Sequence, residues 1–229
     1  MPKLSFDDAA EKFDVTLVEA AEPRRFVLFA VGAGGNPERH LPLLTRLAEQ
    51  GSTVIAPHFE RLASPNVTDQ DLLLRARRLR LSLDAAAGAA LPVVGVGHSI
   101  GTAVLLALAG GRLWTRRGES LAIAPEARLG RLALLAPATG FFQVPGALDA
   151  IKAPVLAWAA TLDTITPPQQ AEFLKLSLGA RVPVELRIAE GAGHFSFMNL
   201  PPPHTTEPLP DREAFLAQLA GEVCRFVSV

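Results

Sequence analysis

The sequence contains a single cysteine, Cys224, which excludes a disulfide within the chain. No basic segment followed by an apolar one stands near the first residue, and no apolar run approaches the roughly 20 residues that cross a bilayer. Neither charge sign predominates, with 22 basic and 23 acidic residues, so the composition gives no support for a nucleic-acid partner. We expect a cytoplasmic protein without a membrane span, and we expect Cys224 on the apolar side of the last helix.

Sequence patterns for metal ions and dinucleotides are missing as well. The histidines are scattered and the cysteine is alone, so no spacing resembles a metal site. The glycine-rich segment at 32–35 lacks the G-x-G-x-x-G spacing of dinucleotide-binding turns. We therefore predict no cofactor and no metal. Because we find no internal repeat and no linker, we expect residues 1–229 to form a single domain.

Short apolar runs dominate the rest of the chain, in which 49% of the residues are hydrophobic. Such runs are typical of strands buried on both faces, and amphipathic helical patterns separate them. Strands that alternate with helices predict an α/β fold with a mostly parallel sheet covered by helices on both faces. The expected strands are 13–20 (antiparallel, at the edge), 26–31, 52–57, 91–96, 131–137, 154–160 and 182–188, and the expected helices are 41–49, 69–86, 102–108, 168–178 and 211–227.

Three further segments of the sequence, at 69–86, 138–153 and 201–210, allow specific predictions. The range 69–86 holds a cluster of arginines between leucines, which indicates the solvated face of an amphipathic helix rather than a phosphate-binding patch. Residues 138–153 are too few to form a large cap domain. The proline-rich range 201–210 is expected to be a rigid loop. The clustered arginines are Arg75, Arg77, Arg78 and Arg80.

The pentapeptide Gly97-His98-Ser99-Ile100-Gly101 joins an expected strand to an expected helix. Its glycines allow a very sharp turn, which would hold the serine hydroxyl exposed at the end of the sheet. The N-terminus of the following helix favours negative charge at the same place. The pattern therefore favours a nucleophilic serine, whereas the alternative is a glycine-bracketed turn with an inert serine.

A serine nucleophile needs a base, and the base needs a group that orients it. His194 follows the last expected strand in a glycine-flanked loop, and Asp163 follows the strand before it. The order Ser99, Asp163, His194, each after a strand, is that of the α/β-hydrolase fold. The alternatives are an ordinary loop histidine and an aspartate that caps a helix or stabilises a turn.

The segment Gly32-Ala33-Gly34-Gly35 follows an early central strand. Glycines there allow close approach, and we predict that the backbone N–H groups of Ala33 and Ile100 form an oxyanion hole facing Ser99. A plain glycine turn is the alternative. A phosphate-binding turn is another, since glycine-rich turns after strands also bind phosphates.

At this point the sequence resembles a known family, the predicted dienelactone-hydrolase-like α/β hydrolases, which are akin to the platelet-activating-factor acetylhydrolases and chlorophyllases. The resemblance covers roughly 26–197 and rests on 97–101, 135–138 and 192–197. It implies one α/β-hydrolase domain with Ser99 as nucleophile, Asp163 as acid and His194 as base.

The sequence departs from this family at two positions. Val31 stands where the family usually has a histidine before the first oxyanion glycine, a change expected to affect the support of the loop more than the chemistry. Ser99 stands where true dienelactone hydrolases have a cysteine, which argues against dienelactone as the substrate.

We expect a serine hydrolase that cleaves small carboxylic esters. A thioesterase, an amidase or an acyltransferase on the same triad is the first alternative, and a non-catalytic binding module is the second. We expect His98 to be structural and His40 and His204 to be surface or loop residues. Candidates for the substrate pocket are His58, Phe141, Phe142, Phe195 and Phe197, with Met198 in the same aromatic cluster, and core packing is the alternative for that cluster.

Overall fold

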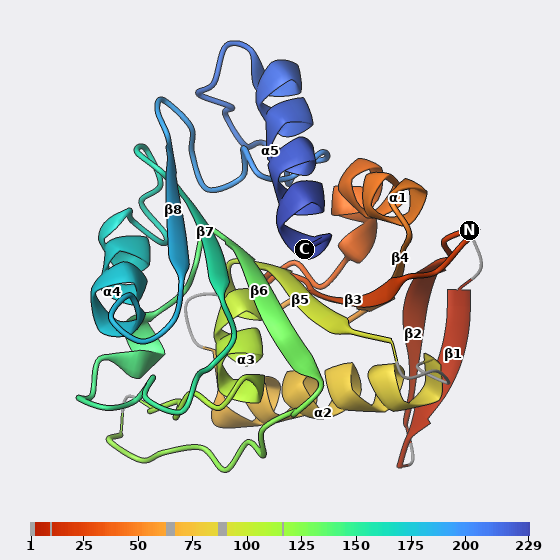
Figure 1. Ribbon diagram of the computed structural model, residues 1–229, viewed down its shortest axis with the longest axis vertical. Helices are drawn as coiled ribbons and strands as arrows, with labels where there is room; N and C mark the ends of the chain where they lie inside the picture. The colour runs from red at the N-terminus through yellow and green to blue at the C-terminus, as the bar shows by residue number, and fades with distance from the viewer. Residues whose placement is uncertain (1–2, 10, 63–66, 87–90, 116) are drawn as a thin grey trace.

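The computed structural model describes residues 3–9, 11–62, 67–86, 91–115 and 117–229 (Figure 1). Within these ranges it consists of an eight-stranded sheet with helices on both faces. The strands are β1 (Lys3–Asp8), β2 (Glu11–Val18), β3 (Arg25–Ala30), β4 (Ser52–Pro57), β5 (Val93–His98), β6 (Leu129–Leu135), β7 (Val155–Ala160) and β8 (Val184–Ala189). The helices are α1 (Leu41–Glu49), α2 (Asp69–Ala86), α3 (Ile100–Leu108), α4 (Gln169–Leu178) and α5 (Arg212–Val227), with 3-10 turns at Pro37–His40 and Gly140–Phe142.

The strand order is β1-β2-β4-β3-β5-β6-β7-β8. The six strands from β3 to β8 run parallel, and β2 pairs antiparallel with β4. The prediction of a mostly parallel sheet is therefore confirmed. The expected position of the strand at 13–20 was wrong in one respect, because β1 pairs with β2 and takes the edge.

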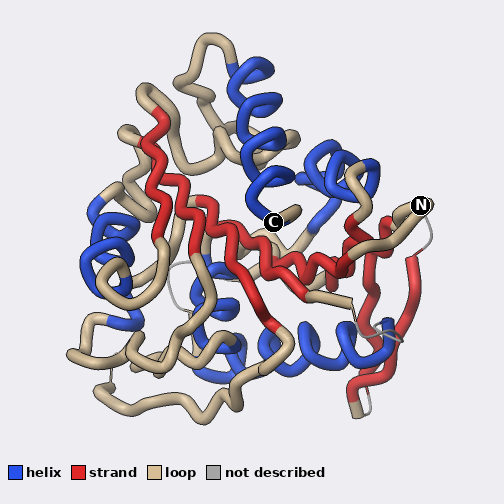
Figure 2. Tube along the Cα trace, in the orientation of Figure 1, coloured by secondary structure: helices blue, strands red, loops and turns tan. Residues whose placement is uncertain are grey.

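Helices cover the two faces unequally. Figures 1 and 2 show α1 and α5 on one face of the sheet and α2, α3 and α4 on the other. Each group buries its apolar side chains in a separate core, and the strand residues alternate between the two. Cys224 lies on the inner side of α5, 7% exposed, as expected.

Helix α2 departs from its expected character. Arg75 and Arg78 are only 2% and 6% exposed, so the prediction of a solvated arginine face was wrong for both. Arg78 donates hydrogen bonds to Asp8 in β1 and to Glu11 in β2. Strands β1 and β2 thus cover this part of α2, and their carboxylates compensate the charge of Arg78. Arg75 points toward the carboxyl end of β3 instead.

The connections between strands match the expected absence of a large cap domain. Residues 136–154 carry one 3-10 turn between β6 and β7 and no other regular element. All six parallel strands end at the same edge of the sheet, so their following loops meet there.

Candidate active site

Ser99 occupies the turn between β5 and α3. Its backbone has φ 54° and ψ −129°, a conformation that a non-glycine residue adopts only under strain. The Ser99 N–H donates to the carbonyl of Leu135 at the end of β6, which anchors the strained residue to the neighbouring strand. The side chain therefore stands at the carboxyl edge of the sheet, as the pentapeptide predicts.

The turn depends on a close approach between α3 and β3. A Cβ atom placed on Gly101 would lie 2.1 Å from the carbonyl oxygen of Ala30 and 2.6 Å from its carbonyl carbon. Both are backbone atoms of the central sheet, so neither can move aside. A side chain at Gly101 would therefore push the first turn of α3 away from β3.

We expect Gly101→Ala to lower the free energy of unfolding by about 3 kcal/mol, because overpacking against backbone cannot be relieved by a rotamer change. Gly221→Ala is the matched control, since a Cβ on Gly221 meets nothing within 4 Å. Gly221 lies inside α5, so its replacement should stabilise the protein by roughly 0.5–1 kcal/mol. Urea unfolding measures both. Equal midpoints for Gly101→Ala and the wild type would contradict the assigned close approach.

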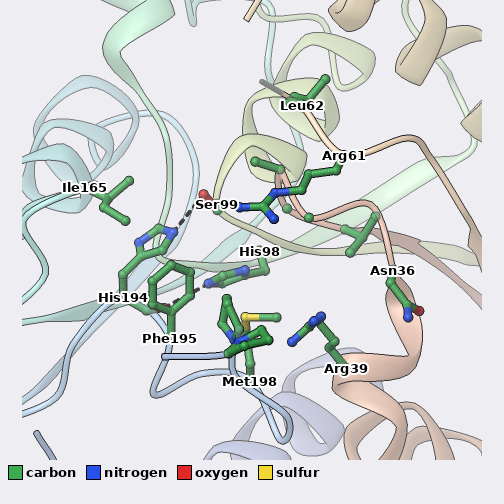
Figure 3. A pocket seen from close by; sticks show the side chains of 16 residues that line it. Asn36, Arg39, Arg61, Leu62, His98, Ser99, Ile165, His194, Phe195 and Met198 are labelled. Carbon is green, nitrogen blue, oxygen red and sulfur yellow. Dashed lines mark hydrogen bonds between the residues drawn. The ribbon is translucent and has the colours of Figure 1, made fainter. Parts of the chain in front are cut away.

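Ser99, His194 and Asp163 are joined by hydrogen bonds, although they come from three different loops. The Ser99 hydroxyl lies 2.9 Å from Nε2 of His194, and Nδ1 of His194 lies 2.7 Å from Oδ2 of Asp163. All three side chains are buried or nearly so. With the proton of the neutral imidazole on Nδ1, Nε2 accepts from the serine while Nδ1 donates to the carboxylate. Figure 3 shows the side chain of Ser99 pointing at the ring of His194, with a dashed line for the hydrogen bond between them.

Asp163 is held as a carboxylate by its surroundings. Burial alone would raise its pKa, but hydrogen bonds from His194 and Thr166 outweigh this and lower the pKa below the usual value. Oδ1 accepts from the N–H groups of Ile165 and Thr166 at 2.8 Å. The turn-aspartate alternative is therefore correct as well, because the bonds that stabilise the turn also orient the carboxylate toward His194.

Thr166 is a member of the cluster that the sequence did not suggest. Its hydroxyl donates to Oδ2 of Asp163 at 2.8 Å and lies 3.1 Å from Nδ1 of His194. The same oxygen lies 3.2 Å from the carbonyl of Ala136. The spacing between Asp163 and Thr166 gave no signal for this contact in the sequence.

The glycine-rich segment after β3 lies directly beside the serine. A Cβ on Gly32 would be 3.1 Å from Nδ1 of His98 and 3.3 Å from Cβ of Ser99, so a side chain there would force its neighbours to shift by a few tenths of an ångström. Neither the N–H of Ala33 nor that of Ile100 donates to another atom within the described ranges. Both groups belong to backbone next to Ser99, which is the placement that the sequence predicts for oxyanion donors.

A cavity of about 240 Å³ opens beside Ser99 and His194. Its wall is mainly apolar, with two arginines, Arg39 and Arg61, and no carboxylate among the lining residues. Arg39 donates to the carbonyls of Leu200 and Pro201, which fixes the proline-rich loop as one side of the cavity. The sequence predicted a rigid loop there but not its place at the site. The remaining lining residues are Val31, Gly32, Ala33, Gly34, Asn36, Leu62, His98, Ile165, Phe195, Met198, Pro202 and Pro203.

Of the aromatic and histidine candidates for the pocket, Phe195 lines the cavity and the others lie elsewhere. His58 is hydrogen-bonded to Thr16 of β2 at 2.7 Å. Phe141 and Phe142 belong to the core around α3. Phe197 is 1% exposed and packs on Phe215 of α5. Met198, from the same cluster, does line the cavity. Aromatic residues near an active edge are often core residues, and sequence alone does not separate the two roles.

His98 and His40 form a buried column beneath His194. The ring centroids are 4.9 Å apart between His194 and His98 and 5.2 Å apart between His98 and His40. Nε2 of His98 lies 3.1 Å from the carbonyl oxygen of His194, in keeping with the expected structural role. His40 is 0% exposed, so its expected place at the surface was wrong. His204 is exposed in the proline-rich loop, as expected.

The site offers no ligand set for a metal. Within the described ranges, histidine, cysteine, aspartate and glutamate side chains do not gather in groups of three that could hold an ion. None of the helices in those ranges combines the length and the apolar character needed to cross a membrane.

No protein-family model matches the sequence, and no curated protein matches it. Solved structures do. Esterase 2 of Thermogutta terrifontis, phosphorylated by paraoxon, matches with a TM-score of 0.68 and 16% identity over 97% of this chain and 92% of that one. A predicted CIB-like hydrolase from Thermoplasma acidophilum matches with a TM-score of 0.67 and 14% identity over 98% of both chains. A serine hydrolase homologue from Coxiella burnetii matches with a TM-score of 0.64 and 14% identity over 98% of this chain and 96% of that one.

This chain has the α/β-hydrolase fold. The prediction of this fold from the sequence is confirmed by the matches, which extend over nearly the whole chain. In an α/β hydrolase the nucleophile follows a central strand, and the acid and the base follow later strands in that order. Ser99, Asp163 and His194 occupy these positions after β5, β7 and β8.

Proposed function

We propose that this α/β hydrolase is a serine esterase that cleaves carboxylic esters through an acyl-enzyme. The observation that carries the proposal is the unbroken path of hydrogen bonds from Asp163 through His194 to Ser99, at the wall of a mainly apolar cavity. Such a path lets the imidazole accept the serine proton while the carboxylate stabilises the charge that develops on the ring. Two of the similar structures are described as an esterase and a serine hydrolase homologue, which supports the same chemistry.

In this proposal Oγ of Ser99 attacks the ester carbonyl, and its proton passes to Nε2 of His194. The N–H groups of Ala33 and Ile100 donate to the oxyanion of the tetrahedral intermediate. His194 then gives the proton to the leaving alcohol, and the acyl group stays on Ser99. Water repeats the sequence in the second half and releases the carboxylic acid. The cytoplasmic location expected from the sequence stays a prediction.

Labelling with an alkyl fluorophosphonate tests the proposal directly. Ser99 Oγ displaces fluoride at phosphorus and gives its proton to His194, so the wild type should gain one phosphonyl group on the peptide that contains Ser99. Intact and peptide mass spectrometry measure the adduct. Ser99→Ala should remain unlabelled. Ser82→Ala is the matched control, because Ser82 is a buried helix serine bonded to the carbonyl of Arg78, and it should label like the wild type.

Two outcomes would contradict the proposed esterase function. One is a folded wild type that gains no phosphonyl group. The other is an adduct that persists at the same rate in Ser99→Ala, which would place the reactive nucleophile elsewhere in the chain.

A further inference from the structure

Arg75 is a buried cation without a buried anion beside it. Its side chain comes from α2 and is 2% exposed, and no carboxylate pairs with it in the part of the chain that the structure describes. Burial lowers its pKa to about 10, partly offset by the negative charge of Asp71. The guanidinium is therefore still protonated at neutral pH. An uncompensated buried charge is costly, so its hydrogen-bond partners indicate what it does.

Those partners are the carbonyls of the segment after β3. Nη1 of Arg75 donates to the carbonyl oxygens of Val31 and Gly32 at 3.0 and 3.2 Å. Nη2 reaches the carbonyl of Glu60 at 3.5 Å, and the guanidinium lies 4.6 Å from the ring centroid of Phe59. One side chain thus joins the loops after β3 and β4, which both contribute to the wall of the cavity.

A trans peptide is planar, with its C=O and N–H groups pointing in opposite directions. Because the Gly32 carbonyl is directed at Arg75, the N–H of Ala33 in the same peptide unit points away from the guanidinium. Arg75 is absent from the cavity wall, whereas Gly32 and Ala33 line it together with Ser99. The N–H of Ala33 therefore points toward the side on which Ser99 lies.

We propose that Arg75 is the positioning residue of the oxyanion hole: it fixes the peptide unit between Gly32 and Ala33 from behind and adds a positive charge to the polarised amide. The inference rests on the esterase function proposed above. It also gives a reason for the departure at Val31, where the family that the sequence resembles usually has a histidine. In this chain the support of the loop comes from α2 rather than from the residue before the first glycine.

A guanidinium in this place has an electrostatic effect that a neutral support would lack. Its charge polarises the carbonyls of Val31 and Gly32, and a polarised amide is a stronger N–H donor. The low polarity of the surroundings strengthens this effect. The benefit appears only when the substrate carbonyl becomes an oxyanion, so it should alter kcat more than KM.

Arg78 provides a matched control for the experiment. It lies three residues further along α2 and is also buried, but Asp8 of β1 and Glu11 of β2 compensate its charge. Neither of these carboxylates lines the cavity. Replacing either arginine by methionine removes a buried cation from the same helix. Only the replacement of Arg75 should affect the oxyanion.

The test compares the wild type with Arg75→Met, Arg75→Lys, Arg78→Met and Arg78→Lys on short p-nitrophenyl esters. It also compares inhibition by an alkyl trifluoromethyl ketone, to which Ser99 Oγ adds to form a hemiketal oxyanion while His194 takes the proton. Arg75→Met should lower kcat about 30-fold with little change in KM, and should weaken the ketone by the same factor. Arg75→Lys should lower kcat about 5-fold, because the lysine ammonium keeps the positive charge but does not make both hydrogen bonds. Inhibition by the matched methyl ketone, which does not form the oxyanion, should not change.

The Arg78 variants should unfold at lower urea concentration yet keep the kcat and the ketone affinity of the wild type. If Arg75→Met also keeps both values, the inference falls while the esterase function stands. If Arg75→Met does not fold, the comparison between Arg75→Lys and Arg78→Lys decides in the same way. If the wild type cleaves no ester and binds the two ketones equally, the proposed function fails and the inference falls with it.

Discussion

Replacing Ser99 by alanine is expected to lower kcat for short p-nitrophenyl esters by roughly 10⁴- to 10⁶-fold, and replacing His194 by alanine is expected to cost about the same. In the proposed mechanism the two groups act as one unit, because the hydroxyl becomes a nucleophile only when Nε2 of His194, 2.9 Å away, accepts its proton. The double variant should therefore be no slower than either single variant. Initial rates with purified proteins at saturating ester measure all three.

The residual rate is as informative as the loss. The N–H groups of Ala33 and Ile100 are backbone groups, so the proposed oxyanion hole remains in both variants and should leave some acceleration over water. KM should stay close to the wild-type value, since neither side chain contributes much to ground-state binding. Losses that multiply in the double variant would show that Ser99 and His194 act in separate steps, and would contradict the proposed mechanism.

The sequence predicted which three side chains meet at the edge of the sheet better than it predicted what packs around them, and the reason is physical. In a parallel sheet the loops after the strands must meet at one edge, so three residues that each follow a strand are brought together by topology alone. Predicting that Ser99, Asp163 and His194 meet required no knowledge of side-chain packing. Predicting the contacts of Thr166 and Arg75 would have required it, because each contacts the site through a hydrogen bond whose partner is fixed only once the loops and helices have packed.

The incorrect predictions for α2 and His40 also arise from packing between residues that are distant in the sequence. The leucine spacing in α2 correctly predicts one apolar face, but it does not reveal that β1 and β2 cover part of the other. Asp8, which binds Arg78, is 70 residues away in the chain. His40 was expected to be a surface or loop residue, yet it packs between Phe29 and His98. Burial that depends on distant partners leaves no periodic pattern in the sequence.

Acid is expected to destabilise the fold through the buried histidines, well above the pH at which carboxylates titrate. Burial lowers the pKa of His40 to about 3 and lowers the pKa of His98 well below its ordinary value, where the neighbouring His194 adds to the effect. In the unfolded chain both titrate near pH 6.5. Between these values the unfolded state binds more protons than the folded state, so stability falls as the pH falls.

The size of the effect follows from the number of protons. Each histidine that must stay neutral in the fold costs about 1.4 kcal/mol per pH unit below its unfolded pKa. His40, whose pKa in the fold is about 3, should therefore lower the free energy of unfolding by about 3 kcal/mol between pH 7.5 and 4.5, and His98 acts in the same direction. Asp163 has a lowered pKa, so its own contribution is lost only in the more acidic range.

Urea unfolding at a series of pH values measures this slope, and His40→Phe separates the contribution of one ring. Phenylalanine keeps an aromatic ring between Phe29 and His98, and it replaces two ring nitrogens that have no partner within the described ranges. Between pH 7.5 and 4.5 the His40→Phe variant should lose about 3 kcal/mol less stability than the wild type. His204→Gln, at an exposed loop position, should leave the slope unchanged. A His40→Phe variant with the full wild-type slope would mean that His40 is protonated in the fold, in contradiction to its buried neutral state.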